Sequence, residues 1–152
     1  MECSLLWNFI AQVKDAYDVH RRRIMVKFDL SAIEVDVLVF LVNNPDLNTA
    51  SQIVKLRKMS KSHVSKAVRG LLEKGYLKSV SDSRDRKKIL LYTTDRAREL
   101  IAYSMEEQRQ FLGNIEANMK PEEEQGFRAC IDRICANISE AYGPELVKPG
   151  EV

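Results

Sequence analysis

Small and basic residues recur at helical spacing between positions 60 and 74, and four of them fall at i, i+3, i+4 and i+7. The candidates on and beside this face are Lys61, Ser62, His63, Ser65, Lys66 and Arg69. Lysine and arginine donate to guanine edges in the major groove, and small hydroxyls reach phosphates or base edges. An ordinary solvated face is the alternative interpretation. No acidic residue occurs from Leu56 to Leu72, so we expect this face to contact DNA.

A second basic cluster follows at positions 81–88. Arg84, Arg86 and Lys87 are predicted DNA contacts, because an arginine at the tip of a projecting loop can enter a narrow minor groove. Asp82 and Asp85 are expected to pair with these neighbours and to stabilise the loop.

The charge distribution separates this region from the rest of the chain. The net charge is only +2, but residues 48–98 hold 14 of the 24 lysines and arginines and 4 of the 22 acids. That segment therefore carries +10 and the remainder −8. A basic block between acidic flanks predicts a polyanionic partner such as double-stranded DNA.

Other chemistry has little support in the sequence. The two histidines, His20 and His63, are far apart, and neither histidine nor cysteine recurs at metal-ligand spacing. There is no phosphate-binding glycine loop and no nucleophile elbow. We expect no enzymatic activity, no cofactor and no metal site.

The cysteines and the apolar segments indicate the compartment. Cys130 and Cys135 are expected to be small core residues. Cys3 is the one candidate for a redox sensor, although no lysine, arginine or histidine stands near it in sequence. No apolar run reaches the length of a membrane span, and the N-terminus does not resemble a signal peptide. The expected location is the cytoplasm.

Apolar periodicity and capping signals define the elements that position these residues. The expected elements are helices at about 4–27, 31–42, 49–56 and 60–74, strands at 76–80 and 88–93, a long helix from 94 or 95 to about 119, and a last helix that starts at Pro121 and is ended by Gly143-Pro144. Ser31 with Glu34 forms a predicted capping box. Two short helices joined by a tight turn and followed by a hairpin predict a winged helix-turn-helix, so the fold class is mainly α (α+β).

The hairpin sequence resembles that of the multiple antibiotic resistance regulator (MarR) family. The family pattern Asp-x-Arg-Asp-x-Arg appears here as residues 82–87, and its Leu-Thr-x-x-Gly helix start appears as residues 93–97. The departures are Lys87 for arginine, Thr93 for leucine and Ala97 for glycine. The resemblance implies a homodimeric transcriptional regulator, expected to be a repressor, whose dimer interface uses the first, fifth and sixth helices.

The resemblance also implies that different segments of the chain have different roles. We expect an N-terminal dimerisation helix at 1–30, a DNA-binding lobe at 31–93 and C-terminal dimerisation helices at 94–152. Large apolar residues in the terminal helices support a dimer with a palindromic operator, because one small lobe cannot bury them all.

Many members of the family bind an aromatic or lipophilic effector. Phe9, Tyr17, Met25 and Phe40 are candidates to line such a pocket, with simple core packing as the alternative. Two other functions stay open at this point. One is a winged helix that binds protein instead of DNA, and the other is a thiol-based redox regulator acting through Cys3.

Overall fold

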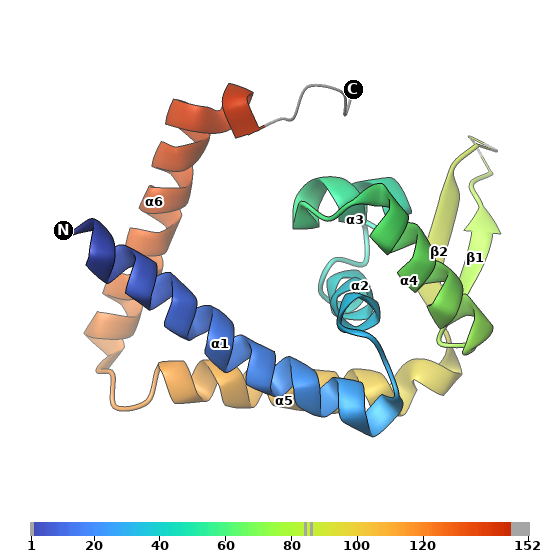
Figure 1. Ribbon diagram of the computed structural model, residues 1–152, viewed down its shortest axis with the longest axis horizontal. Coiled ribbons are helices and arrows are strands. Elements are labelled where there is room, and N and C mark those ends of the chain that lie inside the picture. The colour runs from blue at the N-terminus through green and yellow to red at the C-terminus, as the bar shows by residue number, and fades with distance from the viewer. Residues whose placement is uncertain (1, 84, 86, 147–152) are drawn as a thin grey trace. The chain divides into compact units, whose positions relative to one another are not determined.

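The computed structural model describes residues 2–83, 85 and 87–146. These residues form two compact units, the first ending at Leu112 and the second beginning at Gly113. In the first unit, α1 (Cys3–Phe28) and the start of α5 (Arg98–Ile115) run side by side, and the remaining helices and a hairpin form a lobe (Figure 1). The second unit consists mainly of α6 (Pro121–Leu146).

Helix α2 (Ala32–Asn43) supplies the centre of the core. Ser31 and Glu34 form the predicted capping box, in which the Glu34 amide donates to Ser31 Oγ at 3.3 Å and the Ser31 amide donates to the carboxylate at 2.7 Å. Val35, Val37 and Leu38 are fully buried. The largely apolar sequence of this helix is explained by its packing against α1, α4 and the hairpin.

Helices α3 (Ala50–Arg57) and α4 (Lys61–Glu73) form the predicted helix-turn-helix. Thr49 and Gln52 cap α3 reciprocally, and Lys58 takes a left-handed conformation (φ 53°) in the turn. Ser60 Oγ then accepts the His63 amide at 3.3 Å and starts α4. An apolar stripe on α4 faces the core. Val64, Ala67 and Leu71 are buried, and Val68 and Leu72 are partly buried.

Strands β1 (Leu77–Ser81) and β2 (Ile89–Thr93) form the predicted antiparallel wing beside α4 (Figure 1). Leu77 and Leu91 are both 3% exposed and attach the base of the wing to the core. The Leu91 amide also donates to the Asn48 carbonyl at 2.8 Å. The wing is therefore tied by its backbone to the residue that precedes the helix-turn-helix.

The boundaries of the last two helices differ from the prediction. Helix α5 follows a short 3-10 turn at Asp95–Ala97 and ends at Ile115, not near Met119. Asn118 adopts a left-handed conformation (φ 65°), which its short side chain tolerates, in a turn closed by the Met119 amide and the Glu116 carbonyl.

The prediction that Gly143-Pro144 ends the last helix is wrong, because α6 continues to Leu146. Proline fixes its own φ near the helical value, so the backbone at position 144 can belong to a helix. The helix therefore continues through both residues for a short distance.

The prediction that Cys130 and Cys135 are core residues is also wrong, because Cys3, Cys130 and Cys135 are all exposed. The two residues of α6 lie on a helix that has no buried residue among its described side chains. Its apolar members are equally accessible: Ile131, Ile134, Ile138 and Tyr142 are 43–55% exposed. A single copy of the chain thus leaves the apolar stripe of α6 largely uncovered.

Candidate nucleic-acid interface

The surface of α4 opposite the core carries the predicted contact residues. All six are exposed: Lys61, Ser62, His63, Ser65, Lys66 and Arg69. We call this set the recognition face. Because Val64, Ala67 and Leu71 anchor the opposite side of the helix, the recognition face has a fixed orientation relative to the lobe.

The chemistry of the recognition face suits a polyanion. It presents the amine of Lys66 and the guanidinium group of Arg69 on adjacent turns, and the amine of Lys61 where the helix begins. The first turn of α4 contains no acidic residue, so nothing there offsets the positive end of the helix dipole. An α-helix of this kind fits the major groove, where these donors can reach phosphates and base edges.

The tip of the wing is held by bonds around Asp85. The Lys87 amide donates to Asp85 Oδ1 at 3.0 Å, and the Lys88 amide donates to the Asp85 carbonyl at 2.9 Å. Lys88 Nζ lies 3.9 Å from Asp82 Oδ2. These contacts fit the stabilising role expected of the two acids, which stays a prediction. Lys87 is exposed. The predicted contacts Arg84 and Arg86 lie outside the described residues.

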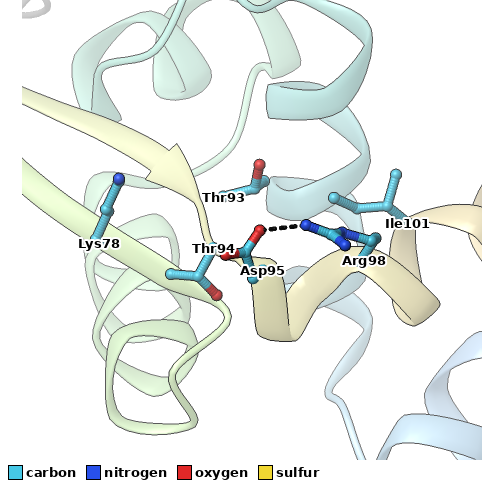
Figure 2. A pocket seen from close by; sticks show the side chains of 6 residues that line it. All are labelled: Lys78, Thr93, Thr94, Asp95, Arg98 and Ile101. Atoms are coloured by element: carbon cyan, nitrogen blue, oxygen red, sulfur yellow. Dashed lines mark hydrogen bonds and ion pairs between the residues drawn. The ribbon is translucent and has the colours of Figure 1, made fainter.

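The base of the wing contains a basic hollow that the sequence did not indicate. It has a volume of about 400 Å³ and is lined by residues of β1, β2 and the start of α5: Lys78, Thr93, Thr94, Asp95, Arg98 and Ile101. Figure 2 shows Arg98 bonded to Asp95, at 2.6 Å. Thr94 Oγ1 instead donates to the Gly75 carbonyl at 2.6 Å. This bond joins the end of β2 to the turn that follows α4. The wing is therefore connected directly to the helix that carries the recognition face.

Comparison with known families identifies the lobe. The model of the MarR family matches positions 28–88, which span the helix-turn-helix and most of the wing. This part of the chain therefore resembles a MarR-family domain. No curated protein sequence matches the chain.

Solved structures of MarR-family regulators share the fold over most of their length. A MarR-family regulator from Silicibacter pomeroyi is 20% identical, with a TM-score of 0.72 over 86% of this chain and 87% of that one. One from Methanosarcina mazei is 11% identical, with a TM-score of 0.74 over 95% and 99%. A regulator from Listeria monocytogenes, solved with a 26mer DNA, is 14% identical, with a TM-score of 0.76 over 95% and 97%. The chain therefore has the fold of a MarR-family transcriptional regulator.

The four candidate effector residues of this MarR-like chain have different environments. Phe40 is 6% exposed in the core, and Met25 packs against that core. Tyr17 meets Phe111 edge to face at 5.6 Å between ring centres, and burial raises the pKa of its hydroxyl. Phe9 is 46% exposed. The hollow at the base of the wing is lined by other residues, so an effector pocket at these four stays a prediction.

Two buried ionic clusters, which sequence reasoning missed, tie α1 to the lobe and to α5. Asp36 of α2 accepts a bond from Arg21 of α1 at 2.9 Å and lies 3.9 Å from Arg57 at the end of α3. His20 Nδ1 lies 2.6 Å from the Glu107 carboxylate of α5. Their partners are 15 or more residues apart in sequence, so no local pattern indicated them.

The surroundings of Asp36 and Glu107 shift the pKa values of the two carboxyl groups in opposite directions. Burial raises the pKa of Asp36 above its ordinary value, and the nearby Arg21 and Arg57 only partly offset that effect. Burial also acts to raise the pKa of Glu107, but hydrogen bonds from His20, Tyr103 and Arg23 outweigh it and lower the pKa. Ionised Glu107 is thus well matched to its site, whereas ionised Asp36 is less so.

Within the described part of the chain, none of the helices has the length and apolar character needed to cross a bilayer.

Proposed function

We propose that the chain is a sequence-specific double-stranded DNA-binding transcriptional regulator that works as a homodimer. The observation that carries the proposal is the recognition face, six exposed polar and basic residues held against a buried stripe in a helix-turn-helix. The wing lies beside it, in the part of the chain that carries the +10 charge. The similar Listeria protein was solved with DNA, which supports the same kind of partner here.

In this proposal the parts of the chain have separate roles. The lobe at 31–93 binds DNA, with α4 in the major groove and the wing against the adjacent minor groove. The segments 1–30 and 94–152 form the dimer, and the exposed apolar residues of α1 and α6 support that assignment. We further propose a cytoplasmic, non-enzymatic repressor whose release from a palindromic operator is controlled by a small aromatic or lipophilic effector.

The proposal is tested by fluorescence anisotropy with a labelled random duplex at low salt, followed by selection of bound genomic fragments. We expect binding that weakens steeply with salt, because lysine and arginine release counterions from the phosphates. Arg84→Ala should weaken binding to all sequences and flatten the salt dependence by about one unit of slope. No binding to duplex, or binding that salt does not change, would favour a protein-interaction module instead.

Exposed Cys3 allows a direct test of the redox alternative. Release of DNA by peroxide that disappears in Cys3→Ser would identify a thiol sensor. An identical response in the wild type and the variant would exclude that role for Cys3.

A further inference from the structure

Glu34 and Gly70 make an unusually close contact where the first turn of α2 meets α4. A Cβ atom added to Gly70 would overlap Glu34 Oε1 and would lie 3.4 Å from Glu34 Cδ. Glycine lies in the interior of α4, where it is among the poorest helix formers. The sequence therefore has an unfavourable helix residue at a point of α4 where a Cβ atom would overlap the Glu34 carboxylate.

The carboxylate is not free to move away. Glu34 is 7% exposed, and its Oε2 accepts the Ser31 amide at 2.7 Å and Lys74 Nζ at 3.2 Å. Lys74 Nζ also donates to the Asp29 carbonyl at 2.7 Å. These bonds join the α1–α2 turn, the start of α2 and the residue that caps α4. Displacing the carboxylate would break the capping box and leave a buried charge without partners.

The contact lies directly beside the recognition face. Gly70 follows Arg69 and comes one turn after Lys66. A hollow of about 540 Å³ connects the two features, with Glu34 and Gly70 lining it together with His63, Lys66 and Arg69. Any shift of α4 away from α2 at Gly70 therefore also moves the side chains of Lys66 and Arg69.

We propose that Glu34 and Gly70 are positioning residues for DNA recognition. Their close approach sets the depth and rotation of α4 on α2, and so the place at which Lys66 and Arg69 meet the bases. This inference rests on the proposed DNA-binding function. It adds that base discrimination depends on a buried carboxylate and a glycine that do not touch DNA.

The test measures the affinity of purified full-length variants for a duplex selected by the wild type and for a random duplex. Gly70→Ala should weaken binding to the selected duplex by about tenfold or more, the size of one lost base contact, with little effect on the random duplex. Glu34→Ala removes the obstructing carboxylate. Adding Gly70→Ala to Glu34→Ala should therefore change selected-duplex affinity by less than about twofold, a coupling that a double-mutant cycle detects.

Gly113→Ala is the matched control, because a Cβ at this α5 glycine meets nothing within 4 Å. It should leave the affinities for both duplexes unchanged. If Gly70→Ala alone fails to fold, Glu34→Ala decides by itself, because the inference then expects a loss of affinity for the selected duplex that the random duplex does not share.

Three results overturn the inference, and they differ from failure of the proposed function. One is a folded Gly70→Ala protein with wild-type affinity for both duplexes. Another is a loss of equal size for the selected and random duplexes. The third is an equally large effect of Gly70→Ala with and without Glu34. If the wild type binds no duplex, the proposed function itself fails and the positioning role falls with it.

Discussion

At the scale of single residues, Lys66 and Arg69 are the side chains most suited to read bases. Both are exposed in the part of α4 that follows Val64. Lys66→Ala or Arg69→Ala should change the preferred sequence and cost about 1–3 kcal/mol on a matched site, or roughly 5- to 150-fold in affinity. Competition binding with single-base variants of the selected duplex measures this loss.

Lys120→Ala is the control for that prediction, because this exposed lysine lies in the turn before α6 and outside the recognition face. It should lower affinity little and leave the sequence preference intact. If Lys66→Ala and Arg69→Ala weakened binding to every sequence equally, both residues would be phosphate contacts instead of base contacts.

Two buried acids should show opposite pH dependences of stability. Burial acts to raise the pKa of Glu34, but hydrogen bonds from Ser31 and Lys74 outweigh it and hold the pKa below its ordinary 4.5. The contribution of Glu34 to the free energy of unfolding is therefore present above pH 4.5 and is lost as pH falls through the folded-state pKa. Burial raises the pKa of Asp36 above its ordinary 3.8, so its contribution is lost as pH rises through the folded-state pKa.

Urea unfolding of Glu34→Gln and Asp36→Asn across the acid range checks these signs. The wild type should have a higher free energy of unfolding than Glu34→Gln, and this difference should shrink as pH falls. The free energy of unfolding of Asp36→Asn should increase relative to that of the wild type as pH rises. Parallel curves for the wild type and a variant would mean that the acid has the same pKa in the folded and unfolded states.

At the scale of elements, the recognition face depends on the buried side of α4. Leu71 is 0% exposed, so Leu71→Ala should lower the free energy of unfolding by about 2–5 kcal/mol. Leu56→Ala in α3 is the matched control, because Leu56 is 51% exposed and its truncation should cost less than about 1 kcal/mol. Denaturant titration by circular dichroism measures both. Equal losses would mean that Leu56 is covered in solution.

Local signals predicted the elements well, because they act within a few residues. The capping box at Ser31, the two helices of the helix-turn-helix and the two strands of the wing appear in the structure close to where the sequence indicated them. The sequence could not predict contacts between segments that are far apart in the chain. Glu34 was recognised as a capping residue, but its approach to Gly70 depends on how α2 packs on α4. The basic hollow at Lys78 and Arg98 likewise exists only because β1 lies next to the start of α5.

At the scale of the whole molecule, a single copy of the chain does not explain why so many large apolar residues are exposed. Cys130 and Cys135 were expected in a core, and the structure leaves them accessible on α6. Leu5 and Trp7 of α1 are also exposed, at 62% and 65%. Large apolar patches on soluble proteins mark interaction surfaces, and a second copy of the chain presents the same residues in return.

A charge on the apolar stripe of α6 should therefore separate the proposed dimer. Ile134 is 46% exposed in the single chain, and Ile134→Glu would place a carboxylate without a partner in the interface. We expect a shift from dimer to monomer in sedimentation velocity, together with weaker binding to a palindromic duplex, since one lobe then engages one half-site. Ala129→Glu adds the same charge to an exposed position away from the stripe and should leave the mass unchanged. A wild-type protein that sediments as a monomer, or an Ile134→Glu variant that remains a dimer, would remove α6 from the proposed interface.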